Sequence, residues 1–439
     1  MKTVFVADLL RAQPGDQVDL SGWVSSKRDQ GRITFLDVSD STGKIQVVVS
    51  AEHGSNGASE IARDIPVESG IVVKGVVSRT PKGRLEIAAH DITLVGGVTR
   101  GFDPHPRSDF DIFAEGMTPH LLANRHIYLR NPKVMAILKY RDSLMHHMRQ
   151  WFRDNRFTSI DAPILTPVPL YEDGTAMKLT VHDEDVFLTQ CVGYYLEAAV
   201  HAFERVYNMG PSFRGEEGRS KRHLMEYWHI KAEVAWCDLD CIIKMVEDII
   251  CFLTKKCQKE LSEELQVLGT TLCTDGMSVP YPRISYEEAV KHLSSLGMQH
   301  EFGKSLGSEE ETLLSKLFPG RPFWITGIPR TIEPFPYCID PADTRITRVA
   351  DLIASNGYGE LLGTAEKIHQ LRELDERLKD KGKHGDPRFE FVRDVHQLGC
   401  VPHAAFGMGV ERMIRWMLNI PHVRDAIPFP RIFRRKISP

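Results

Sequence analysis

The stretch RVYNMGPSFRGEEGRSKRHLMEYWHIKAEVAW, residues 205–236, decides the fold of the larger part of the chain. In residues 229–234 apolar and polar side chains alternate, which is the period of a strand with one buried face. The apolar beginning indicates a partner strand, and the charged residues 215–225 indicate the loop that joins the two. The stretch therefore predicts an antiparallel hairpin of residues 205–214 and 227–236.

Three charged side chains, Arg214, Glu216 and Arg222, fall at the tip of this hairpin. Arginines in such a place can reach triphosphate oxygens through fork-shaped, charge-assisted hydrogen bonds, and a nearby carboxylate can accept from an adenine amino group. Taken separately, each charge is better explained as a solvated surface group, because exposed ion pairs contribute only ~0–1 kcal/mol and are common.

Two further groups have the chemistry of a nucleotide site. The run GMGVER, residues 407–412, is expected to open a helix at 413–418; its glycines let the backbone approach a ligand, and Arg412 can lie over an aromatic base. Asp351 and Glu360 flank the run NGYG, and two carboxylates beside phosphates suit magnesium. Each pattern alone is weak, and a lone acidic pair is more often structural.

The first hundred residues carry a different pattern, with short apolar strands between turns. Five such strands predict a small closed barrel, for which an oligonucleotide-binding barrel is a common nucleic-acid-binding form and a purely structural barrel is the alternative. The strands are expected at residues 17–24, 32–40, 45–49, 70–77 and 84–94. Glycines and prolines in residues 101–125 then indicate a linker.

Beyond the linker, helical spacing of apolar residues predicts a long helix at 131–152, followed by an extended segment at 160–165 whose Pro163 favours an edge or an interface. A second long helix is expected at 238–265. Its cysteines, Cys241, Cys251 and Cys257, are expected in the core.

The bulk composition sets limits on class. The 439 residues, with 42% hydrophobic and 26% charged side chains, are typical of a globular protein of two or three domains. The net charge of -4 requires any RNA contact to use local patches. Eight cysteines without a C-x-x-C pair favour reduced, structural thiols. No apolar run reaches membrane-spanning length, so we expect a cytoplasmic protein without membrane contact.

The charged hairpin tip, the pair Asp351 and Glu360, and the run GMGVER follow one another along the chain in this order. Together they resemble the signature of the class II aminoacyl-tRNA synthetases. The closest likeness is to asparaginyl-tRNA synthetases of the archaeal sort, with aspartyl-tRNA synthetases next, and it rests on runs such as YLEAA at 195–199, EYWH at 226–229 and PFPR at 428–431. The resemblance implies an α+β protein with an OB-fold barrel at 1–100, the linker 101–125, and a catalytic domain at 126–439. That domain would contain an antiparallel sheet flanked by helices.

The resemblance also implies roles for the charged residues, with ATP and Mg²⁺ as cofactors. Arg214 and Arg412 would be catalytic. The nucleotide would be held by Arg214 at the α-phosphate, Glu216 at the adenine edge, Arg222 and His223 at the outer phosphates, and Tyr227 and Arg412 on the two faces of adenine, with Asp351 and Glu360 holding magnesium. In the barrel, Arg28, Phe35 and Gln46 would bind anticodon bases, with a core role for Phe35 as the alternative. Homodimerisation would use the segment around Pro163.

The amino-acid pocket implied by the resemblance departs from the family pattern. It would comprise Glu172, Gln190, Gly193, His229, Lys231, Gly363 and Lys367. Lys231 stands where the asparaginyl enzymes have a glutamate that accepts from the substrate amide, Gly193 stands for a glutamine, and Lys367 for an arginine. A lysine cannot accept a hydrogen bond and cannot bind in the two-pronged way of arginine.

Three functions remain open on the sequence. The first is ATP-dependent activation of an amino acid and its transfer to tRNA, with asparagine as the amino acid, or aspartate if Lys231 and Lys367 face the ligand. The second is a synthetase paralogue recruited to specialised metabolism, which activates another amino acid or uses aminoacyl-tRNA to form an amide or a cyclic dipeptide. The third is a non-catalytic tRNA-binding regulator, against which the complete set of Arg214, Glu216 and Arg412 argues.

Overall fold

A computed structural model of the chain describes residues 1–52, 56–169, 173–215, 221–433 and 435–437. The chain divides into two compact units, Met1–Phe110 and Asp111–Pro439. The division falls inside the predicted linker, 101–125.

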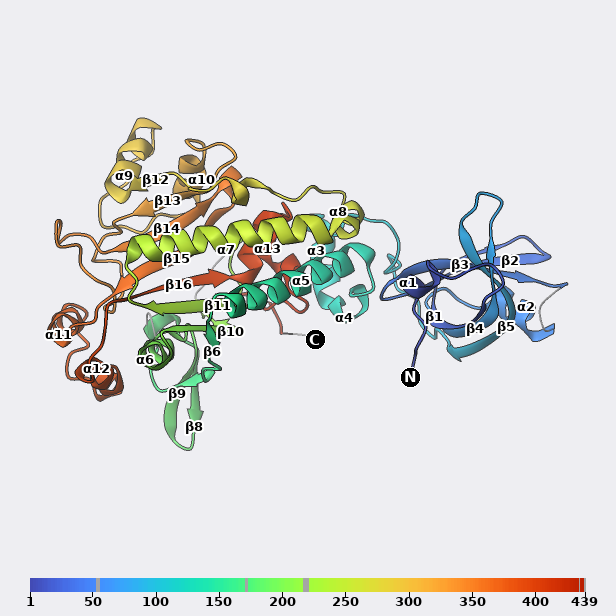
Figure 1. Cartoon of the computed structure of the whole chain (residues 1–439), viewed down its shortest axis with the longest axis horizontal. Coiled ribbons are helices and arrows are strands. Elements are labelled where there is room, and N and C mark those ends of the chain that lie inside the picture. Colours follow the sequence, from blue (N-terminus) through green and yellow to red (C-terminus); the bar gives the residue numbers. More distant parts are fainter. Residues whose placement is uncertain (53–55, 170–172, 216–220, 434, 438–439) are drawn as a thin grey trace. The chain divides into compact units, whose positions relative to one another are not determined.

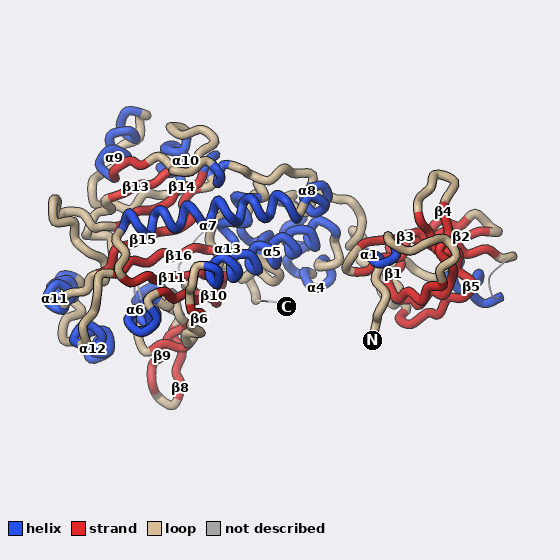
Figure 2. The backbone as a smooth tube through the Cα atoms, viewed as in Figure 1, coloured by secondary structure: helices blue, strands red, loops and turns tan. Residues whose placement is uncertain are grey.

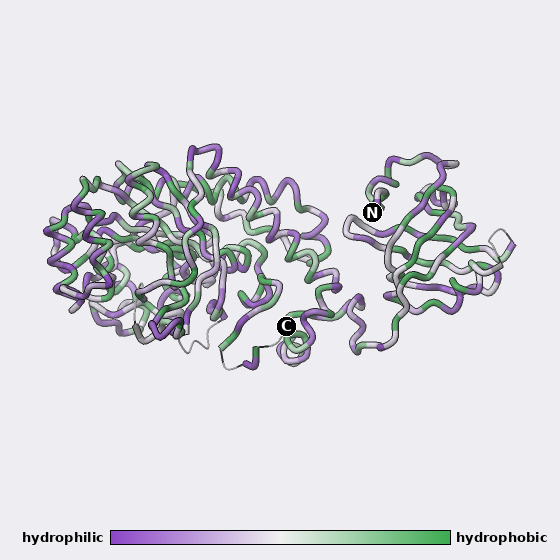
Figure 3. The backbone as a smooth tube through the Cα atoms, turned by 90° about the horizontal axis from the view of Figure 1, so that it is seen from below, coloured by the Kyte–Doolittle hydropathy of each residue, from purple (hydrophilic) through white to green (hydrophobic). Residues whose placement is uncertain are grey.

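The first unit is a closed five-stranded barrel with strand order β1-β2-β3-β5-β4, as predicted (Figure 1). Every second residue of its strands points inward, and side chains such as Leu20, Leu36 and Val73 are fully buried in its core. Green, apolar stretches run through these strands in Figure 3. The elements are α1 (Val6–Leu9), β1 (Gln17–Asp29), β2 (Ile33–Asp40), β3 (Gly43–Ser50), α2 (Asn56–Asp64), β4 (Gly70–Arg79) and β5 (Leu85–Gly96).

The second unit is built on an eight-stranded sheet with the order β12-β13-β14-β15-β16-β11-β10-β6. The ladders from β13 to β10 are antiparallel, whereas β12 and β6 pair in parallel at the two edges. The strands are β6 (Thr158–Ser159), β10 (Arg205–Phe213), β11 (Glu226–Ala235), β12 (Arg283–Ser285), β13 (Phe323–Thr326), β14 (Val349–Ala354), β15 (Gly359–Lys367) and β16 (His403–Gly409). The predicted α+β class is confirmed, and so is the predicted hairpin, formed by β10 and β11.

Two long helices, α5 (Pro132–Asp154) and α7 (Leu239–Glu260), lie on one face of this sheet (Figures 1 and 2). Both begin at a side-chain cap: Asn131 accepts from the backbone N–H of Lys133, and Asp238 accepts from that of Cys241. On the sheet side, Trp324 of β13 donates to the Glu247 carboxylate of α7 at 2.9 Å. The helices therefore cover one face and leave the other for the site.

Other short elements complete the second unit. Helices are α3 (Thr118–Ala123), α4 (Arg125–Tyr128), α6 (Gly193–Phe203), α8 (Ser262–Leu268), α9 (Tyr286–Ser295), α10 (Ser308–Ser315), α11 (Leu371–Asp380), α12 (Glu390–Gln397) and α13 (Val410–Met417). A small sheet is formed by β7 (Leu165–Thr166), β9 (Glu184–Leu188) and β8 (Lys178–Val181). Single 3-10 turns are η1 (Glu115–Met117), η2 (Asp173–Thr175), η3 (Asp275–Met277), η4 (Ser355–Gly357), η5 (Pro387–Phe389) and η6 (Val423–Ala426). Within the described ranges, no helix has the length and apolar character needed to cross a membrane.

Some sequence predictions about these elements are wrong. The helix expected at 238–265 ends at Glu260, and α8 follows as a separate helix. The glycines of the GMGVER run belong to strand β16, so the helix begins at Val410 rather than at 413. These glycines lie at the end of β16, where the sheet borders the site.

The prediction of reduced thiols is wrong for one pair of cysteines. Cys237 and Cys241 form a disulfide whose Cα atoms are 5.5 Å apart, within the range such a bond needs. Cys241 is exposed at the start of α7 rather than in the core, because the disulfide joins the first turn of the helix to the residue before its cap. Cys251 and Cys257, further along α7, are buried as predicted.

Candidate active site

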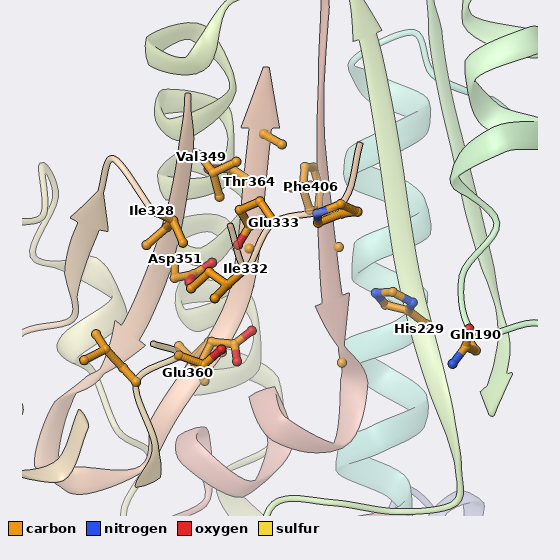
Figure 4. A pocket seen from close by; sticks show the side chains of 18 of the residues that line it. Gln190, His229, Ile328, Ile332, Glu333, Val349, Asp351, Glu360, Thr364 and Phe406 are labelled. Carbon is orange, nitrogen blue, oxygen red and sulfur yellow. The ribbon is translucent and has the colours of Figure 1, made fainter. Parts of the chain in front are cut away.

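A cavity of about 750 Å³ opens on the sheet face opposite α7. Its walls come from strands β11, β14, β15 and β16, from the start of α13 and from the irregular segment 328–337. In Figure 4, Gln190 and His229 lie on one side of this space, and Glu333, Asp351 and Glu360 lie on the other. The cavity therefore has two ends with different chemistry.

The hairpin supplies the basic side chains of the first end. Arg214 follows β10 directly, where its backbone N–H donates to the Met225 carbonyl at 2.9 Å and closes the ladder. Arg214, Arg222, His223 and Tyr227 all line the cavity. Glu216, the predicted adenine contact, lies outside the described residues.

Arg412 reaches the same cavity from the first turn of α13. Its guanidinium donates to the backbone carbonyl of Glu360 at 3.1 Å and lies 3.1 Å from the Glu360 carboxylate. The structure thus brings Arg214 and Arg412, 198 positions apart in the sequence, to one space. This is the convergence that the motifs require.

A bulge aims two carboxylates at the cavity. Asp351 of β14 lies opposite Gly363 of β15, but next to Leu352 the register shifts and Ile353 pairs with Glu360. The extra residue, Leu361, turns Glu360 to the sheet face that already carries Asp351. Both predicted metal ligands therefore line the cavity.

The carboxylates repel one another. Burial and the charges of Glu360 and Glu333 raise the pKa of Asp351 well above its ordinary value. Burial and Glu360 also raise the pKa of Glu333 to about 7. Burial acts in the same direction on Glu360, but Arg412 and Arg222 outweigh it and hold its pKa below the ordinary value. The charged forms of Asp351 and Glu333 are therefore disfavoured in the protein alone, and a divalent cation beside them would relieve this.

A second arginine of the hairpin is held in place by a residue that the sequence analysis missed. Arg222 forms a buried two-pronged ion pair with Glu311 of α10, and Glu311 also accepts from the backbone N–H of Glu360 at 2.7 Å. Glu311 and Glu333 carry no short motif, and both stand in parts of the chain whose pattern is not periodic. Their proximity to the cavity could not be read from local spacing.

The other end of the cavity is lined by His229 and Lys231, which lie on the same face of β11. His229 stacks at an angle on Tyr227, with ring centroids 5.7 Å apart, and its Nδ1 lies 3.3 Å from Ser212 Oγ. Burial, with the charges of Lys231 and Arg214, lowers the pKa of His229 to about 3, so the ring is neutral. A Cβ at Gly407 would lie 2.7 Å from the His229 ring, so only glycine fits opposite it.

Lys231 is 5% exposed, yet it lines the cavity and makes no hydrogen bond or ion pair with any described residue. Gly193 at the start of α6 lies directly against it: a Cβ there would be 3.2 Å from Lys231 Nζ. Gln190 also lines the cavity, with its amide donating to Thr175 Oγ1 at 2.8 Å. The glycine and the lysine therefore fit each other as a pair.

Of the other residues predicted for the amino-acid pocket, one lines the cavity and one does not. Gly363 lines the cavity. Lys367 does not, because its ammonium is buried between the carboxylates of Glu197 and Glu233, the latter at 2.8 Å. Glu172 lies outside the described residues.

In the barrel, the three predicted anticodon contacts form one patch on the outer surface. The Arg28 guanidinium lies 5.6 Å from the Phe35 ring centroid and donates to Gln46 Oε1 at 2.9 Å. Gln46 in turn donates to Glu86 at 2.7 Å. Phe35 is half-buried outside the core, so the alternative of a core phenylalanine is wrong.

Comparisons with known proteins agree with this architecture. The family model of class II tRNA synthetases (D, K and N) matches residues 118–432, and that of the OB-fold nucleic acid binding domain matches residues 18–95. The asparagine–tRNA ligases of Thermococcus gammatolerans and Pyrococcus abyssi are each 34% identical, over 98% of this chain and 97% and 98% of their own lengths.

A solved structure is similar along the whole chain. The crystal structure of asparaginyl-tRNA synthetase from Pyrococcus horikoshii complexed with asparaginyl-adenylate superimposes with a TM-score of 0.90 at 32% identity, and the match covers 100% of both chains. The resemblance predicted from the hairpin, the acidic pair and the GMGVER run is confirmed. This chain belongs to the class II tRNA synthetases of the aspartate, lysine and asparagine group.

Proposed function

We propose that this protein activates asparagine with ATP and esterifies it to the 3' end of a tRNA. The observation that carries the proposal is the convergence of Arg214 and Arg412 on one cavity, in a chain that matches asparagine–tRNA ligases over 98% of its length. In the first step the amino-acid carboxylate attacks the α-phosphate of ATP and pyrophosphate leaves. In the second step a hydroxyl of the terminal adenosine attacks the acyl carbon and AMP leaves.

No side chain of the cavity needs to act as a nucleophile, so the residues work by positioning and by charge. Arg214 stabilises the α-phosphate as it becomes pentacoordinate, and Arg222 and His223 hold the departing pyrophosphate. Adenine lies between Tyr227 and Arg412, with Glu216 at its edge. The existing ion pairs of Arg222 and Arg412 fix these guanidinium groups before ATP arrives.

Magnesium belongs to the proposal as the ion held by Asp351 and Glu360. The raised pKa values of Asp351 and Glu333 support it, because uncompensated carboxylates beside phosphates fit a cation with oxygen ligands. The ion supplies neutralisation of the phosphate charge. Asp351 and Glu360 orient it, and Glu333 adds to the local negative potential.

Lys231 takes over the recognition of the substrate side chain. A lysine donates and cannot accept, so in this position it suits the Oδ1 oxygen of asparagine rather than its amide nitrogen. Gln190, His229, Gly363 and Gly193 shape the surrounding wall, and Glu172 completes the predicted set. An aspartate carboxylate would also accept from Lys231, which makes aspartate the competitor to test.

Three further expectations belong to the proposal, on anticodon binding, location and dimerisation. The barrel binds the anticodon through Phe35 as a stacking platform, with Arg28 and Gln46 at the base edges. The protein is a cytoplasmic homodimer that pairs through the segment around Pro163. The dimer is supported by Ile164 and Leu165, apolar side chains that are 43% and 48% exposed.

Pyrophosphate exchange into ATP, measured with each of the twenty amino acids, tests the first step. Exchange that depends on asparagine, followed by charging of a tRNA, is the expected result. Exchange with aspartate alone would show that Lys231 binds a carboxylate and would contradict the assignment of asparagine. Silence with all twenty amino acids would contradict activation itself.

A further inference from the structure

A second cluster of reactive side chains lies beyond the cavity, where α6 meets the loop between α12 and β16. Cys400 Sγ lies 2.9 Å from the Nε2 of His201, and the rings of His201 and His403 are 5.0 Å apart between centroids. The three ligand atoms, Cys400 Sγ and one nitrogen from each histidine, all lie within 4.8 Å of one another. Neither the cavity nor the proposed reaction uses them.

Three buried atoms at this cluster, His201 Nδ1, His403 Nε2 and Glu233 Oε2, have no hydrogen-bond partner among the described residues. His403 Nδ1 lies 2.8 Å from the Val401 carbonyl, so Nδ1 carries a proton and Nε2 is the ring nitrogen that faces the cluster. Glu233 Oε2 is likewise unpartnered, while Oε1 of the same carboxylate lies 3.3 Å from His403 Nε2. Both residues are 0% exposed. Buried polar atoms without partners are rare and require an explanation.

We propose that this cluster binds one Zn²⁺ ion through His201 Nε2, Cys400 Sγ and His403 Nε2. A thiolate with two imidazoles is a donor set that zinc prefers. In a tetrahedral site with bonds of about 2.0–2.3 Å, ligand atoms are roughly 3.5 Å apart. The separations here lie on either side of that value, so small side-chain shifts complete the geometry.

The surroundings support a structural site. The Nδ1–H of His403 donates to the Val401 carbonyl, and a hydrogen bond of this kind usually orients a ligating histidine. His396 lies nearby, but both of its nitrogens lie within 3.0 Å of backbone carbonyls, of Val392 and Ile368, and it is therefore not counted as a ligand. Cys400 is half-buried, so an ion can reach it from solvent.

Zinc at this position would tie α6 to β16. The first residue of α6, Gly193, lies against Lys231, and β16 leads directly into the helix that carries Arg412. The ion would fix the position of α6 relative to β16 without contacting a substrate. The proposal rests on the cluster alone and does not depend on which amino acid the protein activates.

The test uses the full-length protein, purified without chelators. We expect one equivalent of zinc per chain, and after replacement by Co²⁺ a thiolate-to-cobalt charge-transfer band. Cys400→Ser and His201→Ala should each weaken zinc binding at least about tenfold in competition with a chelator, and Cys400→Ser should abolish the band. Cys251→Ala, which removes a buried cysteine of α7, is the matched control and should leave both unchanged.

Three results would overturn the proposal: wild-type protein that binds neither zinc nor cobalt, a cobalt complex without the thiolate band, or full zinc retention in Cys400→Ser. The last would place the ion elsewhere, for example at the carboxylates of the cavity. Circular dichroism of each variant shows whether it folds, and His201→Ala, which keeps the thiol, separates loss of a ligand from loss of the cysteine.

Discussion

The two ends of the cavity hold their cations in different ways. At the end proposed to bind the nucleotide, the guanidinium groups of Arg222 and Arg412 already have carboxylate partners in Glu311 and Glu360. At the amino-acid end, Lys231 has none among the described residues, although it is almost fully buried. Because no hydrogen-bond or ion-pair partner from the described residues lies beside its ammonium, a ligand can supply one. The difference indicates that the proposed nucleotide end is complete before binding, whereas the proposed amino-acid end would be completed by its substrate.

The two buried lysines of the catalytic unit allow the sharpest test of this comparison. Lys367→Met should lower the free energy of unfolding by about 3–5 kcal/mol, because it leaves the buried carboxylates of Glu197 and Glu233 without their cation. Urea denaturation measures the change. The KM for asparagine should stay the same in the protein that remains folded. The exposed pair Arg372–Glu376 is the control, and Arg372→Ala should cost no more than ~1 kcal/mol.

If Lys367→Met instead raised the KM for asparagine and spared stability, Lys367 would contact the substrate. The two ends of the cavity would then each contain a paired cation, and the comparison would fail.

Arg412→Ala should have the next largest effect. Removing a preorganised group that stabilises developing charge typically costs about 100- to 1,000-fold in rate, and Arg412 both lies at the nucleotide site and restrains Glu360. The measurement is the rate of asparagine-dependent pyrophosphate exchange at saturating ATP. Arg372→Ala serves again as the control. A loss of less than about tenfold, or about 1.4 kcal/mol, would show that Arg412 does not face the reacting nucleotide.

The nucleotide end could be predicted from sequence because each part of it is local. A hairpin tip and the first turn of a helix each display their charges within a few residues, so the pattern of types and spacings is visible. Glu333 and Glu311 could not be predicted in this way. They reach the cavity from an irregular segment and from a separate helix, and only the tertiary fold brings them to Glu360.

The two lysines show a second limit. Strand period places Gly363 and Lys367 on the same face of β15. The four residue steps from Gly363 to Lys367 span about 13 Å at 3.3 Å per residue, which carries Lys367 beyond the end of the cavity. An alternating pattern predicts on which face of a sheet a residue lies. It does not predict how far along the strand the residue lies from the site. The Cys237–Cys241 disulfide was missed for a related reason, since their spacing matches no motif and the helix cap brings them together.

Lys231→Met tests the amino-acid end directly. Loss of a hydrogen bond from a charged donor to the substrate side chain costs about 1.5–3 kcal/mol, so the KM for asparagine should rise about 10- to 150-fold. The KM for ATP should not change, because the nucleotide end keeps its own ion pairs. Stability should be unchanged or slightly higher, since the lysine has no partner to lose. Steady-state exchange kinetics and urea denaturation together separate this variant from Lys367→Met, and an unchanged KM for asparagine would remove Lys231 from the site.

The smallest effect is expected for Gly193→Ala. The new Cβ would lie 3.2 Å from Lys231 Nζ and 3.4 Å from its Cε, so the flexible end of the lysine must shift by a few tenths of an ångström. A displacement of that size should raise the KM for asparagine only about two- to fivefold, equivalent to less than about 1 kcal/mol. Gly116→Ala, where a Cβ meets nothing within 4 Å, should have no effect. Because Gly193 acts through Lys231, the same alanine introduced into Lys231→Met should add nothing to its KM. Additive effects in the double variant would show that Gly193 contacts the substrate by itself and that the lysine and the glycine are not a pair.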